Sequence, residues 1–297
     1  MRIGIGKQGA ALVAAAAIAA GGLRADEETQ AKKPGKEAEI ASVANFRDVG
    51  GIKVAGGKTV KKGALYRSGH FGRTSPADLE KLAALGLKSD FDLRTPPERM
   101  AFPDRMPAAV KEVSCNLMGD ADAKLTIKLA KLLANPKAAS EAQGEERAQA
   151  IIARIYRDFV AKPGARRELR KFYLGLVAEG GLPAVVHCTS GKDRTGWATA
   201  ALLAFLGAPR EAIAADYLRT NDYVLPSQRK TLDAFVASGG DKEIGETILG
   251  VKAANLDAAF DEVAKEYGTI EEYFAKGLEL DESVRRALRE KLLAPSE

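Results

Sequence analysis

Hydrophobic residues occur along the chain in short blocks that glycine and proline separate. Between two such blocks, the apolar spacing over residues 79–85 predicts a helix, with Ser75 as its cap, Pro76 at its first position and Gly86 after its end. The blocks themselves are typical of buried strands and cover residues 63–69, 87–94 and 182–188. Strands that alternate with helices predict an α/β fold with a parallel or mixed central sheet.

Other stretches follow a helical pattern. Residues 123–160 are interrupted at Asn135-Pro136 and around Gly144, and we interpret them as a helical insertion beside the sheet and a candidate lid. This insertion offers no obvious catalytic side chain. Near the C-terminus, helices are expected over residues 210–224, 227–237, 252–266, 269–277 and 281–293. Their charges alternate in sign, which favours packing into the domain over membrane binding.

The N-terminal region differs from the rest. Residues 1–25 combine basic residues, an apolar run over 10–20 and small residues after it, which is the layout of a secretory signal peptide. The run is too short for a membrane span, so we expect no stable span after the leader is removed. Residues 26–41 are polar and are expected to form a flexible tether, and residues 42–297 a single domain. The expected location is secreted or periplasmic; the alternative is a flexible N-terminus on a cytosolic protein.

Composition narrows the class of protein. The 297 residues include 46% hydrophobic and 29% charged residues, as in an ordinary globular protein, and two cysteines exclude a disulfide scaffold. Three of the five net positive charges come from Arg2, Lys7 and Arg24, so the remaining chain carries only two. That balance does not favour a nucleic-acid partner.

The segment 185–207 carries the strongest chemical signal. An apolar strand leads into His187 and Cys188, a glycine-containing loop follows, and a helix begins near Arg194. Main-chain amides and the positive end of a helix dipole at such a turn create an anion site, and the Arg194 guanidinium matches phosphate oxygens. The same groups lower the pKa of a cysteine, here with Thr195 available to hydrogen-bond the sulfur. This set predicts phosphoryl transfer through a cysteinyl-phosphate intermediate, without a metal or another cofactor.

These residues, HCTSGKDRTG, match the Cys-x5-Arg signature of protein tyrosine and dual-specificity phosphatases. The chain resembles the atypical bacterial family of secreted tyrosine-protein phosphatases related to lipid phosphatases. The similarity extends through NFRDVGG, LYRSGH, DLRTPPER, DYLRTND and YGTIEEYF, from about Asn45 onward. It implies a dual-specificity-phosphatase-like central mixed sheet flanked by helices. The implied substrates are phosphotyrosine, with phosphoserine, phosphothreonine and phosphoinositides as further candidates.

The resemblance also implies site residues. Cys188 is expected to be the nucleophile and Arg194 to stabilise the phosphoryl group. The chain has only one tryptophan, Trp197, and so lacks the Trp-Pro-Asp loop that carries the general acid in conventional tyrosine phosphatases. In the family that the chain resembles, the aspartate five residues after the nucleophile has this role, which implies that Asp193 is the general acid. Asp104 and Asp216 are weaker candidates. The expected substrate-binding residues are Thr189, Ser190, Gly191, Lys192 and Thr195, with Lys192 as a cation at the mouth of the site.

Other residues have less specific interpretations. We expect His187 to fix the loop by hydrogen bonding, His70 to pack or tie a loop, and Cys115 to be structural or incidental. Arg47, Asp48 and Arg94 are expected to form an ion network under the loop. Three alternatives remain open: a phosphate-binding module without catalysis, another cysteine-loop enzyme such as a sulfurtransferase or a cysteine phytase, and a protein that binds a partner through its helical insertion.

Overall fold

The computed structural model describes residues 40–121, 123–141 and 143–296. The expected signal peptide and nearly all of the expected tether lie outside the described residues. Ile40, near the end of that tether, is buried against the sheet, so the packed part of the chain includes it.

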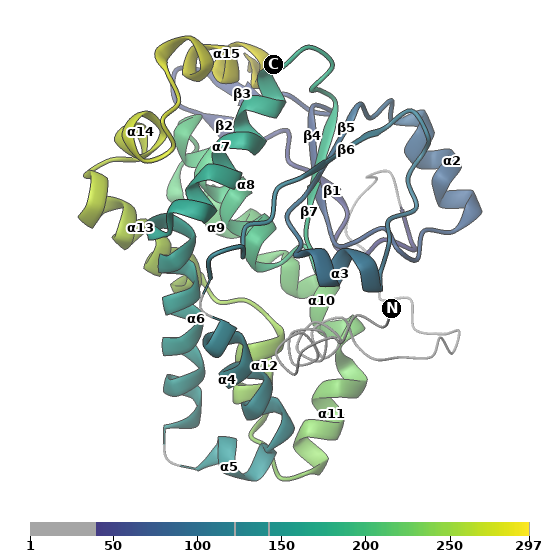
Figure 1. The fold of residues 1–297 in the computed structure, drawn as a ribbon, viewed down its shortest axis with the longest axis vertical. Helices are drawn as coiled ribbons and strands as arrows, with labels where there is room; N and C mark the ends of the chain where they lie inside the picture. The colour runs from purple at the N-terminus through teal and green to yellow at the C-terminus, as the bar shows by residue number, and fades with distance from the viewer. Residues whose placement is uncertain (1–39, 122, 142, 297) are drawn as a thin grey trace, which may run out of the picture.

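A five-stranded mixed sheet forms the centre of the upper part of the molecule in Figure 1. Its strand order is β1-β4-β7-β5-β6, and all neighbours are parallel except β1, which is antiparallel to β4. The bounds are Arg47–Asp48 (β1), Leu65–Ser68 (β4), Ser89–Asp92 (β5), Lys111–Ser114 (β6) and Ala184–His187 (β7). The three strands predicted from apolar blocks are β4, β5 and β7, which are adjacent in the sheet. The predicted mixed α/β fold is therefore confirmed.

Alternate residues of the central strands pack into two different cores. Val186 and Phe91 face a large core that includes Trp197, whereas Val185 and Tyr66 face a smaller core. This alternation follows from the two-residue period of a strand and shows that both faces of the sheet are covered. On the larger side lie helices α7 (Pro163–Val177) and α8 (Asp193–Phe205); on the other lies α2 (Pro76–Ala84).

The predicted helical insertion is present and lies below the sheet in Figure 1. It consists of α4 (Ala123–Ala134), α5 (Pro136–Ser140) and α6 (Gly144–Ala161), so the chain breaks at the predicted Asn135-Pro136 and Gly144 positions. Helix α6 also packs against α12 and α13 from the C-terminal region. The insertion is thus joined to the domain by helices that come later in the chain.

The remaining elements complete the domain. They are α3 (Pro96–Ala101), α9 (Arg210–Leu218), α10 (Thr220–Ser227), α11 (Arg229–Ala237), α12 (Lys242–Leu249), α13 (Ala253–Tyr267), α14 (Ile270–Glu272), the π-helix η1 (Tyr273–Gly277) and α15 (Glu282–Leu292). A second, three-stranded sheet contains β2 (Lys53–Val54), β3 (Lys58–Val60) and β8 (Leu293–Pro295).

The C-terminal region differs from the prediction in three details. The helix expected over 210–224 is two helices, α9 and α10, joined at Arg219. Helix α12 had no predicted counterpart. The last helix ends at Leu292, and the next residues form β8, which pairs with β3 far away in sequence. Such a pairing depends on long-range contacts, which a local pattern cannot contain.

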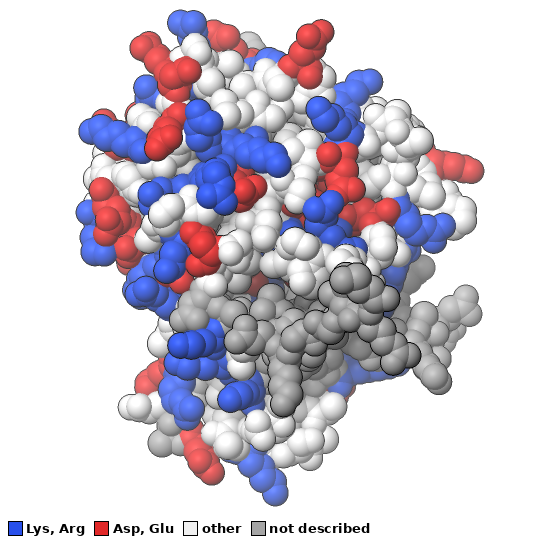
Figure 2. Space-filling model, in the orientation of Figure 1, with Lys and Arg blue, Asp and Glu red and all other residues white. Residues whose placement is uncertain are grey.

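On the face shown in Figure 2, basic and acidic side chains are interspersed over the upper part of the molecule. No helix among the described residues has the length and apolar character needed to cross a bilayer.

Candidate active site

The Cys188 loop, defined as residues 188–194, lies at the carboxyl end of the central strand β7. Strand β7 ends at His187, and α8 begins at Asp193, so the loop connects the middle of the sheet to a helix N-terminus. The carboxyl ends of the parallel strands β4 and β5 lie on either side. This is the sheet edge at which α/β proteins bind their ligands.

The loop is held from outside through its carbonyl groups. Asn45 Nδ2 donates to the carbonyls of Ser190 (3.1 Å) and Gly191 (2.9 Å), and Arg67 also donates to Gly191 (3.0 Å). The carbonyl of Thr189 accepts from the amide of His70 at 3.1 Å. In a trans peptide the N–H points opposite to the C=O, so these contacts turn the following amides toward the inside of the loop. The result is a concave set of donors suited to an anion.

Gly191 is required at its position for two reasons. Its φ of +65° is unfavourable for other residues, and a Cβ there would lie 2.4 Å from the carbonyl oxygen of Ser68. The loop can therefore curve tightly against β4 only because residue 191 has no side chain.

The Cys188 side chain is buried at the base of the loop and is 2% exposed. Burial by itself raises the pKa of this thiol, but the charge of Arg194 and the hydroxyl and amide of Thr195 outweigh it, so the pKa lies below its ordinary value. The sulfur thus has the environment of a reactive thiolate. Cys115 is the opposite case: it is fully buried, and burial raises its pKa to about 12. This agrees with its predicted structural role.

Arg194 is held by Glu98, a residue that the sequence analysis did not identify. Its two terminal nitrogens donate to the two carboxylate oxygens of Glu98 at 2.8 and 2.7 Å, and one also lies 3.3 Å from the Thr189 hydroxyl. Burial raises the pKa of Glu98, but Arg194 outweighs it and keeps the carboxylate ionised. The bidentate pair fixes the plane of the guanidinium beside the loop.

Local structure places Glu98 at this point. Thr95 caps α3, with Pro96 and Pro97 following, and Glu98 accepts hydrogen bonds from the Thr95 amide (2.9 Å) and hydroxyl (2.7 Å). The available signal was the T-x-x-E spacing within DLRTPPER, which is typical of a capping box. In this protein the glutamate of the capping box also binds Arg194 of the Cys188 loop.

Asp193 lies at the first position of α8, with its side chain 35% exposed. One carboxylate oxygen, Oδ1, accepts a hydrogen bond from the hydroxyl of Tyr156 at 3.0 Å. Tyr156 comes from α6 of the insertion, in which the sequence indicated no catalytic side chain. Lys192 Nζ is 3.6 Å from Oδ2 and donates to the carbonyls of Ile248 (2.8 Å) and Leu249 (3.4 Å) at the end of α12.

The other two candidate acids lie behind the loop. Asp216 is buried between Arg47 (2.9 Å) and Arg67 (2.6 Å), and these arginines outweigh burial and lower its pKa to about 2. Asp104 accepts from the amide of Phe71 at 2.7 Å and pairs with Arg94. Neither carboxylate lines the cavity above Cys188.

Most of the ion network predicted under the loop is present. Arg47 pairs with Asp216, and Arg94 pairs with Asp92 (2.8 Å) and with Asp104. The prediction for Asp48 was wrong, because its carboxylate accepts from the amides of Gly50 (2.7 Å) and Gly63 (2.6 Å) and so ties a turn.

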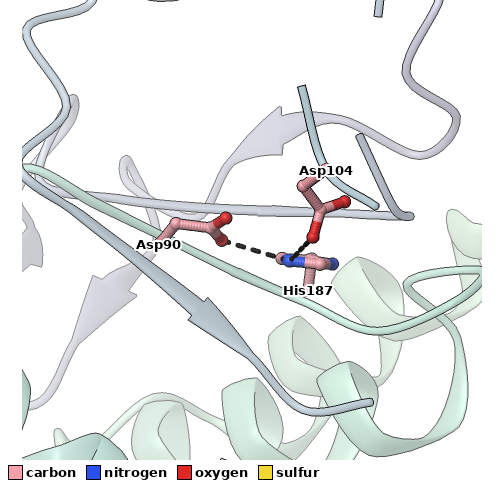
Figure 3. A group of neighbouring side chains, drawn as sticks. All are labelled: Asp90, Asp104 and His187. Atoms are coloured by element: carbon pink, nitrogen blue, oxygen red, sulfur yellow. Dashed lines mark ion pairs between the residues drawn. The ribbon is translucent and has the colours of Figure 1, made fainter. Parts of the chain in front are cut away.

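His187 belongs to a buried cluster below the loop, shown in Figure 3. Its Nε2 lies 3.1 Å from Asp90 and 3.5 Å from Asp104, and its Nδ1 lies 3.2 Å from the carbonyl oxygen of Cys188. Burial lowers the pKa of His187, but Asp90, Asp92 and Asp104 together outweigh it and raise the pKa to about 10. The ring therefore bears a charge and supports the loop, as predicted for this residue.

Asp90, Asp104 and His187 are also residue types that bind metal ions. Ligand atoms of Asp90, Asp104 and His187 lie within 4.8 Å of one another. Two carboxylates beside the ring already have a cationic partner, because Arg94 pairs with both Asp92 and Asp104. The cluster is better explained as an ion network.

His70 lies outside this cluster. Its Nδ1 accepts a hydrogen bond from the amide of Gly72 at 3.1 Å, in agreement with its predicted loop-tying role.

A cavity of about 210 Å³ opens above Cys188. Cys188, Thr189, Ser190, Lys192, Asp193 and Arg194 lie at its polar end. Its walls are mainly apolar and come from the insertion and α12, with residues Leu129, Leu133, Ile152, Ile155, Phe159, Ile248 and Leu249. Gly191 and Thr195 belong to the loop and to α8 but do not line the cavity. The site therefore combines an anion-binding base with a hydrophobic wall.

Comparisons with known proteins agree with this geometry. Residues 38–294 match the model of the "Tyrosine phosphatase family". A Cupriavidus necator protein named as a tyrosine-protein phosphatase is 33% identical over 81% of this chain and 83% of its own length. The triple specificity protein phosphatase PtpB of Mycobacterium tuberculosis is 31% identical over 79% of this chain and 91% of its own length. The chain belongs to the tyrosine phosphatase family and is a cysteine-dependent phosphatase of the protein-tyrosine-phosphatase type.

Proposed function

We propose that this phosphatase hydrolyses phosphotyrosine through a phosphocysteine intermediate on Cys188. The observation that carries the proposal is the position of the Cys188 sulfur, which lies beside Arg194 and Thr195 at the N-terminus of α8 and has a lowered pKa. A thiolate at the base of an anion-binding loop is positioned to attack a phosphorus atom held by that loop.

The proposed reaction has two steps. The Cys188 thiolate attacks phosphorus while the bond to the leaving oxygen breaks, and Asp193 gives a proton to that oxygen. Water then attacks the phosphocysteine, Asp193 takes a proton from the water, and inorganic phosphate leaves with the thiolate restored. Arg194 and the inward-facing amides stabilise the equatorial oxygens in both steps.

The apolar walls support an aromatic substrate. A phosphotyrosine ring next to the loop would bury apolar surface against Ile152, Ile155 and Phe159, which a phosphoserine side chain cannot do. PtpB is named as a triple specificity protein phosphatase, so phosphoserine and phosphothreonine remain candidate substrates. Phosphoinositides remain a further proposal, although the ammonium of Lys192 already binds main-chain carbonyls.

The decisive variant is Cys188→Ser, assayed with a phosphotyrosine peptide, a phosphothreonine peptide, phosphatidylinositol phosphates and phytate. We expect the variant to lose turnover on every substrate, and the wild type to act best on phosphotyrosine. Acid quench of the wild type during turnover should trap phosphate on Cys188. Full activity of the serine variant would refute the mechanism, and preferential release from phytate would favour the cysteine-phytase alternative. A wild-type protein that binds phosphate without a product burst would favour the binding-module alternative.

Two further expectations concern access and location. The insertion lines the cavity with residues of α4 and α6, which supports its role as a lid. Export of the enzyme remains a proposal from the sequence of residues 1–25. It can be tested by fractionating cells that express the full chain and a form without these residues; equal cytosolic retention of both would refute it.

A further inference from the structure

A chain of buried and partly buried side-chain hydrogen bonds leads from Gln149, through α13 and α9, to Asp193. It consists of Gln149, Asn255, Tyr217 and Tyr156, which come from α6, α13 and α9. Tyr156 and Tyr217 are both 0% exposed. Burial is the largest cause that raises the pKa of each phenol, so both keep their protons at neutral pH.

The donor and acceptor at each step of this hydrogen-bond chain follow from its first two residues, Gln149 and Asn255. Gln149 Nε2 donates to Asn255 Oδ1 at 2.9 Å, and Asn255 Nδ2 then donates to the Tyr217 hydroxyl at 3.2 Å. Tyr217 can therefore give its own proton to the Tyr156 oxygen, 2.5 Å away. Tyr156 in turn gives its proton to Asp193 Oδ1 at 3.0 Å. Each hydroxyl has a single proton, so in this direction each tyrosine hydroxyl accepts one hydrogen bond and donates one.

The packing of α8 permits this arrangement. A Cβ at Gly196 would lie 2.7 Å from the Tyr217 ring, so the glycine allows Tyr217 to approach the helix that carries Asp193. Oδ2 of Asp193 accepts no hydrogen bond from any residue that the structure describes. Lys192 Nζ, 3.6 Å from Oδ2, donates to the α12 carbonyls instead. The two oxygens of Asp193 thus have different environments.

We propose that Tyr156 is a positioning residue for Asp193, and that its donated hydrogen bond reserves Oδ2 as the oxygen that carries and transfers the acidic proton. The inference rests on the proposed role of Asp193 as the general acid. Because Oδ1 already accepts a proton from Tyr156, the proton of the neutral acid belongs on Oδ2. When Oδ2 gives this proton to the leaving oxygen, the Tyr156 hydrogen bond stabilises the carboxylate that forms.

The test compares kcat/KM for aryl phosphates whose leaving groups differ in acidity, since a general acid matters most for a poor leaving group. For Tyr156→Phe we expect kcat/KM to fall about tenfold with phenyl phosphate and less than about threefold with 2,4-dinitrophenyl phosphate. Tyr217→Phe should lower kcat/KM for both substrates, in each case by a smaller factor than Tyr156→Phe. Tyr173→Phe is the matched control, because Tyr173 is also fully buried but donates to the carbonyl of Ala198. Tyr173→Phe should leave the ratio of the kcat/KM values for the two substrates unchanged.

The Asp193→Asn variant, alone and combined with Tyr156→Phe, distinguishes the acid role of Asp193 from the positioning role of Tyr156. If Asp193→Asn reduces kcat/KM equally for both substrates, the proposed acid is wrong and the inference about Tyr156 is wrong with it. If Asp193→Asn is selective for the poor leaving group but Tyr156→Phe is not, only the positioning role is refuted. In the Asp193→Asn background, Tyr156→Phe should have no further effect on the ratio; a repeated tenfold loss would also refute it. Thermal unfolding of each variant identifies losses that come from misfolding.

Discussion

The Glu98 carboxylate offers a direct test of how the active-site arginine is positioned. Its two oxygens accept hydrogen bonds from both terminal nitrogens of Arg194, from the amide and hydroxyl of Thr95 and from the hydroxyl of Thr189. Glu98→Ala removes all of these contacts. Glu98→Gln keeps the shape but replaces the charge and turns one acceptor into a donor that faces other donors.

The expected loss of stability follows from the burial of the Arg194–Glu98 ion pair. The side chains of Arg194 and Glu98 are only 13% and 10% exposed, and removal of one partner from a buried ion pair costs about 3–5 kcal/mol. Loss of the capping contacts to Thr95 adds about 1 kcal/mol. We therefore expect Glu98→Ala to lower the free energy of unfolding by about 4–6 kcal/mol. Because the guanidinium also loses its fixed orientation, kcat/KM should fall about a hundredfold, the size of effect that follows from misplacing a catalytic group by about 1 Å.

The assay combines urea unfolding with kinetics on 4-nitrophenyl phosphate. Addition of vanadate should stabilise Glu98→Ala less than the wild type, since an Arg194 without its fixed orientation binds the oxyanion more weakly. Glu112→Gln is the control, because Glu112 is also paired with an arginine but its side chain is 49% exposed. This variant should change the free energy of unfolding and kcat/KM only slightly. Wild-type kcat/KM in both Glu98 variants would show that Arg194 does not need this carboxylate.

Three further predictions concern the loop and its surroundings. The pKa of His187 is about 10 in the folded protein and 6.5 unfolded, so its stabilising charge is fully present below pH 6.5 and is lost as pH rises through 10. Urea unfolding should show wild-type stability falling across this window; in His187→Gln this contribution should be absent, and an unchanged slope would contradict the assignment. Gly191→Ala should abolish turnover and lower the unfolding temperature, because its Cβ would lie 2.4 Å from Ser68; normal kinetics would refute that constraint. Mass spectrometry after brief iodoacetate treatment at pH 7 should find Cys188 alkylated and Cys115 unmodified, and labelling of Cys115 first would contradict the pKa directions of the two thiols.

The centre of the fold was predictable because local patterns determine it. Strands β4, β5 and β7 are short apolar blocks with clear boundaries, and the insertion breaks at Pro136 and Gly144 as expected. Strands β1, β2, β3, β6 and β8 have two to four residues each and depend on partners from elsewhere in the chain. A local pattern does not contain those partners, so these strands were missed.

The same distinction between local patterns and long-range contacts explains which residues of the site could be predicted. Cys188 and Arg194 lie within one continuous segment, and their spacing could be interpreted directly, whereas the role of the neighbouring Asp193 was implied by the family resemblance. Glu98 and Tyr156 reach the site from separate helices, and only tertiary packing brings them to Arg194 and Asp193. The capping-box spacing around Glu98 is typical of a helix start, but it contains no information about a second partner.

The loop sequence alone is therefore not sufficient to make an anion site. Its amides point inward because Asn45 and Arg67 hold the carbonyls of residues 190 and 191 from outside. Arg67 is in turn held by Asp216, a buried carboxylate that also binds Arg47. The segments NFRDVGG, LYRSGH and DYLRTND thus meet behind HCTSGKDRTG and keep it in its binding conformation. Their substitution should weaken phosphate binding even though none of these side chains lines the cavity.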